Sequence, residues 1–204
     1  MQNVSIKGFI YTALSSATFG LAPFFTISLL LAGFSSFEVL AYRWGIASLT
    51  LVVFGIMLGE TFRISRKDWG TVFILSLLRA ATSFSLVIAY QNISSGVAST
   101  IHFMYPVLTT LIMMLFFKEK KSGWRIAAIA SAVAGVYFLS GGDTKTGSFS
   151  FLGLFIVLLS ALGYALYLVT MSQLKIGQMK GLLLTFYVFL FGGILLFIGT
   201  ETIS

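Results

Sequence analysis

The sequence predicts an all-α protein that crosses a lipid bilayer about seven times. Of its 204 residues, 58% are hydrophobic and only 9% are charged, and the mean hydropathy is +1.00. The apolar residues form long runs, and the charged residues lie almost entirely between them. A bilayer core of ~30 Å needs about 20 helical residues to cross it. These runs lack the ten-residue alternation of a membrane barrel, so helices are expected.

Each predicted span is an apolar run close to that length. The first run follows Lys7 and is longer than the apolar core of a typical signal peptide, so it is predicted to be a span rather than a leader. The fourth ends abruptly in KEKK, and the fifth carries a small-residue ridge for close helix packing. The predicted spans are residues 8–31, 36–58, 70–91, 95–117, 124–140, 150–172 and 181–199.

The basic residues of the short connections predict the orientation. Every second connection is rich in Lys and Arg, whereas Lys145 is the only basic residue in the alternate connections. By the positive-inside rule, the N-terminus is expected in the cytoplasm and Ser204 outside, in a multi-pass protein of the cell membrane. Arg43 and Arg79 are different, because both fall within predicted spans.

A weak internal repeat is visible at an offset of 145 residues. It aligns GFIYTALSSATFG from Gly8 with GLFIVLLSALGYA from Gly153, and it places Phe19 on Tyr164. The offset equals five spans, an odd number, so the second copy would cross the membrane in the opposite sense. The pattern therefore predicts an inverted repeat, of which the chain holds one full copy and two helices of the next.

The stretch from LLRAATSFSLVIAYQNISSG to AVAGVYFLSGG resembles the EamA-like family of the drug/metabolite transporter superfamily. The matching features are Arg79, the Ala89–Tyr90 pair before a polar turn, Pro106, Glu119 after an aromatic helix end, and a small-residue helix with Gly135. Residues 8–140 resemble one complete five-helix EamA-like repeat, and residues 150–204 resemble the first two helices of a second.

The resemblance implies a secondary transporter. Family members are expected to have ten spans in two inverted five-helix halves, a central cavity, and alternating access for a small metabolite or amino-acid-like solute. The chain departs from that pattern, since the last three spans have no counterpart here. Two interpretations stay open: a transporter, inactive alone if it is truncated, or a non-transporting fragment or one half of a split or assembled transporter.

Arg79 is the sharpest candidate for a functional residue. It lies about nine residues into its span, roughly 14 Å deep at 1.5 Å per residue. An arginine that faced lipid there would cost several kcal/mol, so it is expected to face the bundle interior or a wet cavity. Ser83 and Tyr90 share its side of the helix. Arg79 is interpreted as a cation for an anionic group of the solute, or alternatively as a structural arginine.

The fourth span contains the only histidine of the chain and one of its two prolines. His102 shares a helix face with Ser99 and Thr109 at nearly the depth of Arg79, so it is expected to line the cavity. Imidazole titrates near neutrality, which also makes it a candidate for proton coupling. Pro106 removes a backbone hydrogen bond and is expected to kink the helix, as is Pro23 in the first span.

Other candidates carry weaker signals. Ser16 and Phe19 in the first span, with Tyr164 and Tyr167 in the sixth, would occupy equivalent faces of the repeat and suit an amphipathic solute. Glu38 is a second candidate for proton coupling. Arg43, between Tyr42 and Trp44, is interpreted as an interfacial anchor.

The residue inventory argues against other functions. The chain has no Cys, one His and no pair of buried carboxylates, so no enzyme activity, metal site or cofactor is predicted. A seven-span receptor is disfavoured by the cytoplasmic N-terminus. The net charge of +7 lies at membrane boundaries rather than on a nucleic-acid-binding face. The expected partners are the lipid bilayer, a small-molecule solute, and another copy or a complementing C-terminal half.

Overall fold

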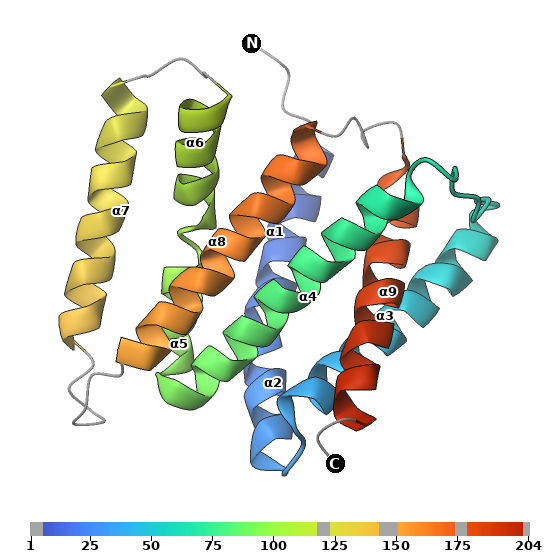
Figure 1. Cartoon of the computed structure of the whole chain (residues 1–204), viewed down its shortest axis with the longest axis horizontal. Helices are drawn as coiled ribbons and strands as arrows, with labels where there is room; N and C mark the ends of the chain where they lie inside the picture. Colours follow the sequence, from blue (N-terminus) through green and yellow to red (C-terminus); the bar gives the residue numbers. More distant parts are fainter. Residues whose placement is uncertain (1–5, 118–122, 143–150, 174–178, 202–204) are drawn as a thin grey trace.

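The computed structural model describes residues 6–117, 123–142, 151–173 and 179–201. In this part of the chain the structure is helical and contains no strand (Figure 1). The basic stretch KEKK, with Glu119, lies outside the described residues, as do the side chains of Ser16 and Phe19. The helices are α1 (Ile6–Gly20), α2 (Ala22–Leu31), α3 (Ser36–Met57), α4 (Trp69–Asn92), α5 (Ser95–His102), α6 (Tyr105–Phe116), α7 (Gly123–Gly142), α8 (Phe151–Gln173) and α9 (Gly181–Glu201).

Five helical segments in the described residues are long and apolar enough to cross a membrane: α3, α4, the α5–α6 pair, α8 and α9. Shorter apolar helices cover Ala22–Leu31 and Ile126–Phe138. Together they match the predicted order of spans, and the prediction of a polytopic helical membrane protein is confirmed.

Two predicted spans are each interrupted at a proline. Pro23 stands in the first turn of α2, directly after the break at Leu21, and Pro106 stands in the first turn of α6, after the break at Phe103 and Met104. Proline lacks a backbone N–H and is tolerated without distortion only in the first turn of a helix. A helix that precedes a proline therefore ends or bends there. The kinks expected at both residues are therefore present.

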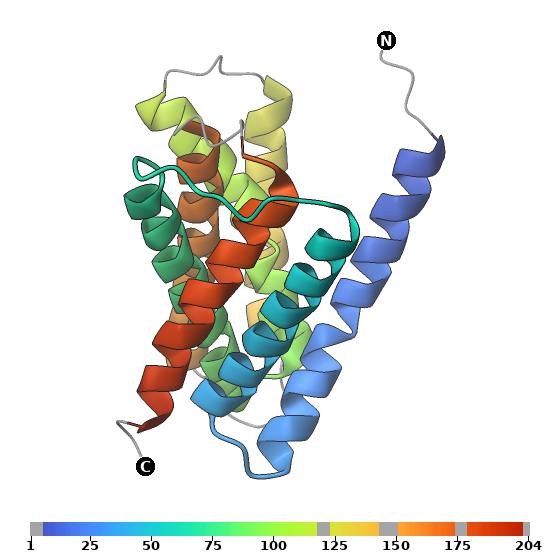
Figure 2. The same ribbon diagram turned by 90° about the vertical axis from the view of Figure 1, so that its right-hand side faces the viewer.

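The bundle is organised around two pairs of neighbouring helices. In Figures 1 and 2, α4 lies beside α8, and α3 lies beside α9, with α4 also in contact with α9. The α1–α2 rod lies at one edge of the bundle (Figure 2). The buried apolar residues between α4 and α9 are Val72, Leu75, Leu184, Phe186, Tyr187 and Val188.

Glycines bring the paired helices close together. The backbone of Gly192 in α9 approaches the ring of Trp44 in α3 so closely that a Cβ at this position would overlap the ring. At Gly163 in α8, a Cβ would lie 2.6 Å from Oγ1 of Thr82 in α4. Lipid is as apolar as the face of a membrane helix, so the hydrophobic effect does not drive helices together in a bilayer. Close van der Waals contacts, which small residues allow, supply much of the packing energy instead. Each of the two helix pairs contains one such contact.

The start of α1 and the end of α9 lie at opposite ends of the bundle (Figure 1), as an odd number of crossings requires. At the end near the start of α1, the α3–α4 connection is tied to α9. Lys180 Nζ lies 2.6 Å and 2.8 Å from the two carboxylate oxygens of Glu60, and the Tyr187 hydroxyl donates to the carbonyl of Phe62 at 3.0 Å.

Candidate functional site

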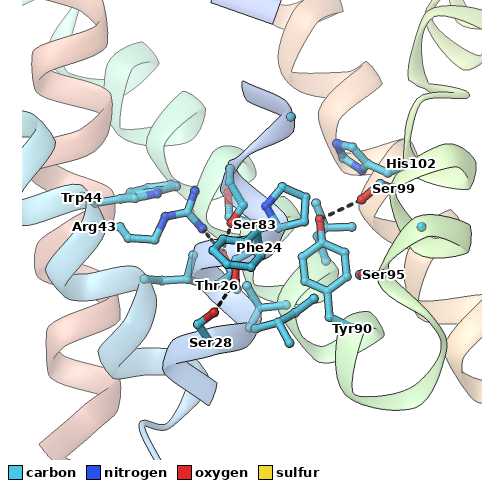
Figure 3. Close-up of a pocket in the computed structure, with 18 of the residues that line it drawn as sticks. Phe24, Thr26, Ser28, Arg43, Trp44, Ser83, Tyr90, Ser95, Ser99 and His102 are labelled. Atoms are coloured by element: carbon cyan, nitrogen blue, oxygen red, sulfur yellow. Dashed lines mark hydrogen bonds between the residues drawn. The ribbon is translucent and has the colours of Figure 1, made fainter. Parts of the chain in front are cut away.

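A cavity of about 1140 Å³ opens between α2, α3, α4 and α5. Residues along the whole of α2 and α5 line it, together with residues of α3 between Leu40 and Ala47 and of α4 between Arg79 and Tyr90. Figure 3 shows Arg43 and Thr26 on one side, and Tyr90, Ser99 and His102 on the other. The volume is at or above the usual range of small-molecule pockets, so a metabolite fits. The polar residues that line it are Thr26, Ser28, Arg43, Arg79, Ser83, Tyr90, Ser95, Ser99, Thr100 and His102.

Arg79 lines this cavity from α4. Its Nη1 donates to the Ser83 hydroxyl at 3.3 Å, one turn further along the helix. Its guanidinium carbon lies 4.8 Å from the centre of the Tyr164 ring, a cation–π distance. The serine and the tyrosine hold the side chain in place, but neither neutralises its charge.

Arg43 also lines the cavity, from α3, and it was missed as a site residue by the sequence analysis. Its Nη1 donates to Thr26 Oγ1 at 2.7 Å, and the fully buried Thr26 hydroxyl in turn donates to the carbonyl of Ala22. The interfacial-anchor interpretation does not hold, since Trp44 beside it is only 5% exposed and packs among helices. The available signal was depth: Arg43 stands seven residues past Ser36, or about 10 Å at 1.5 Å per residue.

His102 lies at the end of α5 and is 4% exposed. Ser160 of α8 bonds to both His102 Nδ1 at 3.1 Å and the carbonyl of Thr82 at 2.8 Å. A serine hydroxyl can donate only one hydrogen bond, and Ser160 donates it to the carbonyl of Thr82, because a carbonyl oxygen can only accept. Ser160 therefore accepts from the Nδ1–H of His102. This network joins α4, α5 and α8 at the cavity wall.

Tyr164 and Tyr167, two of the aromatic residues expected at the site, are not among the residues that line the cavity. Tyr164 stacks on Tyr167 with centroids 5.7 Å apart and meets Tyr105 edge-on at 4.5 Å. Pro106 follows Tyr105 at the start of α6 and is also not among the lining residues. The sequence placed these residues on the pathway, and the structure places Tyr164 in contact with Arg79.

Glu38 has a local role in the structure. It stands at the third position of α3, where its carboxylate accepts from the backbone N–H of Ser35 at 2.7 Å, while the Ser35 hydroxyl accepts from the Glu38 N–H at 3.2 Å. This reciprocal capping box starts the helix after the turn. Glu38 is not among the residues that line the cavity. Across the cavity from Arg43, the Tyr90 hydroxyl lies 3.2 Å from that of Ser99 (Figure 3).

Comparisons with known proteins agree with this architecture. Residues 6–141 match the model of the EamA-like transporter family. The chain is similar to a Bacillus subtilis (strain 168) protein named as the uncharacterized transporter YojE, with 28% identity over 186 residues, or 87% of this chain and 59% of the relative. It is also similar to mouse (Mus musculus) solute carrier family 35 member G1, with 27% identity over 144 residues, or 68% of this chain and 39% of that protein.

The chain thus spans between about two fifths and three fifths of the length of these curated relatives. No solved structure matches the chain.

Proposed function

The chain belongs to the EamA-like transporter family, and from this premise we propose that it carries a small metabolite or amino-acid-like solute across the cytoplasmic membrane by alternating access. The observation that carries the proposal is the polar cavity between α2, α3, α4 and α5, which holds two arginines from the candidate membrane spans α3 and α4. Intramembrane charges that face a cavity mark solute pathways in membrane proteins.

The position of the cavity supports a specific conformation. In α3 and α4, the lining residues lie toward the α2–α3 and α4–α5 turns, which the positive-inside rule assigns to the outer face. The opposite end is tied by Glu60, Lys180, Tyr187 and Phe62. We propose that this is the outward-facing state, and that movement of one repeat against the other would expose the cavity to the cytoplasm.

The test is counterflow in liposomes that contain the purified chain. The labelled probes are succinate, glutamate, leucine and glucose, each compared with liposomes without protein. Ala47→Trp places a large ring in the cavity from α3 and is expected to abolish counterflow. Val53→Trp, on an exposed position of the same helix, is the matched control and is expected to retain it.

If the folded wild-type chain gives no counterflow with any probe, the transporter proposal for the chain alone fails. One part of an assembled transporter would then be the better interpretation. Co-expression with a candidate complementing half, followed by the same assay, would separate this alternative from a non-transporting fragment.

A further inference from the structure

Two guanidinium groups from neighbouring helices line the same cavity. Arg43 is fixed by Thr26, and Arg79 by Ser83 and the ring of Tyr164. Each of these contacts is made to a neutral group. A guanidinium has five N–H donors, so both side chains retain donors for a ligand.

The cavity wall offers these arginines no counter-charge. Among the residues that the structure describes, none of those lining the cavity is an Asp or Glu. The ion pair between Glu60 and Lys180 lies at the other end of the bundle. Desolvated charges are costly unless they are neutralised, and two like charges in one cavity raise that cost. A ligand with negative charge would remove the imbalance.

We propose that the solute of this cavity is a small organic anion whose acidic groups bind between Arg43 and Arg79. The planar guanidinium fork matches a carboxylate or phosphate in two-point geometry. Phe24, Leu86 and Phe103 supply apolar surface for the carbon skeleton. This inference rests on the proposed transport function and names its solute class. Two arginines favour a dianion over a monoanion.

The first test uses four-carbon probes that differ in charge. Binding of succinate, its neutral diamide succinamide, and the dication putrescine is measured by calorimetry on the full chain in lipid nanodiscs. Succinate is expected to bind at least tenfold more tightly than either of the others. The proposal is overturned if succinamide or putrescine binds as tightly as succinate, or if none of the three binds.

The second test assigns the binding to the two arginines. Arg43→Gln and Arg79→Gln are each expected to weaken succinate binding at least tenfold, whereas Arg66→Gln, at an exposed position of the α3–α4 connection, is expected to have no effect. Unchanged affinity in both cavity variants would overturn the proposal.

A chemical measurement covers the case in which a variant does not fold. Phenylglyoxal modifies arginine side chains, and peptide mass spectrometry locates the product in the wild-type chain. Succinate is expected to slow modification of Arg43 and Arg79 several-fold and to leave Arg66 unchanged. Equal protection of all three, or of none, would contradict the assignment.

The proposed transport and the solute class fail in different ways. Succinate binding without counterflow would leave the anion site intact and overturn transport by the chain alone. Counterflow of leucine or glucose without succinate binding would leave transport intact and overturn the solute class.

Discussion

Thr26 connects the α2 segment to the arginine of α3, and it does so while fully buried. Thr26→Val keeps the shape of the side chain and removes the acceptor of the 2.7 Å bond from Arg43. A hydrogen bond to a charged group contributes about 1.5–3 kcal/mol, part of which the freed arginine regains from water in the cavity. We expect succinate affinity to fall about 5- to 10-fold in calorimetry, with little change in helix content by circular dichroism.

Thr50→Val is the matched control for this substitution. Thr50 lies on the exposed side of α3, and its hydroxyl donates to the carbonyl of Ile46 in the same helix. Its replacement is expected to leave succinate affinity unchanged. If the two variants behave alike, Thr26 does not position Arg43 for the solute.

The depth of an arginine in its span could be predicted from the sequence, but its partners could not. Arg79 was expected to face the bundle interior or a cavity because it lies about nine residues into its span, where an arginine that faced lipid would be costly. Arg43 was assigned to the interface because of Tyr42 and Trp44, although it contacts Thr26 in another helix. The bond between His102 and Ser160 joins residues 58 positions apart, and no local pattern predicts such a contact.

At the scale of helices, the contact between α3 and α9 depends on a notch at Gly192 that accepts the ring of Trp44. Gly192→Ala adds a methyl group that would overlap this ring. Overpacking of a close contact typically costs about 1–3 kcal/mol. We expect a lower midpoint in thermal unfolding in detergent, with the loss of the compact form followed by tryptophan fluorescence.

Gly45→Ala, at the residue directly after Trp44 in α3, is the control. A Cβ at Gly45 meets no atom within 4 Å, and alanine favours a helix over glycine by about 1 kcal/mol. The control is expected to keep or raise the unfolding midpoint. If the unfolding midpoint falls equally in both variants, the loss of stability does not come from the close contact between Gly192 and Trp44.

The spans and their interruptions follow from local sequence, whereas the pairing of helices does not. Apolar runs predicted each span to within a few residues, and Pro23 and Pro106 predicted the two breaks, because both effects act along one helix. The contacts of α4 with α8 and of α3 with α9 require matching surfaces on segments far apart in the chain. Glycines are common in apolar helices, so Gly163 and Gly192 could not be recognised from the sequence as the close contacts.

At the scale of the whole molecule, the orientation and the accessibility of the cavity can be tested together. The chain has no cysteine, so a single introduced thiol reports without background. Thr100→Cys lies at the cavity and Ser65→Cys in the α3–α4 connection. An impermeant methanethiosulfonate reagent is expected to label the first in right-side-out vesicles and the second only in inside-out vesicles. The reverse pattern would contradict the predicted N-terminal orientation.

The Glu60–Lys180 pair allows a test of the proposed outward-facing state, because it joins the α3–α4 connection to the start of α9 at the predicted cytoplasmic end. Glu60→Lys replaces the ion pair with repulsion. The Lys180 side chain is 70% exposed, so the effect is expected to stay within about 1 kcal/mol, equivalent to a population shift of about fivefold. Labelling of Thr100→Cys from the outside should therefore slow by up to fivefold.

Exchange of the two charges, Glu60→Lys with Lys180→Glu, restores attraction in the same geometry and should restore the labelling rate. A merely local loss of stability would not recover in this way, since each substitution would add its own cost. The difference in labelling rate between the single and the double variant also has to disappear at high salt, because ions screen both the repulsion and the attraction of an exposed pair. If the double variant labels as slowly as Glu60→Lys alone, the pair does not hold the cytoplasmic end closed, and the helix contacts around Phe62 and Tyr187 must do so.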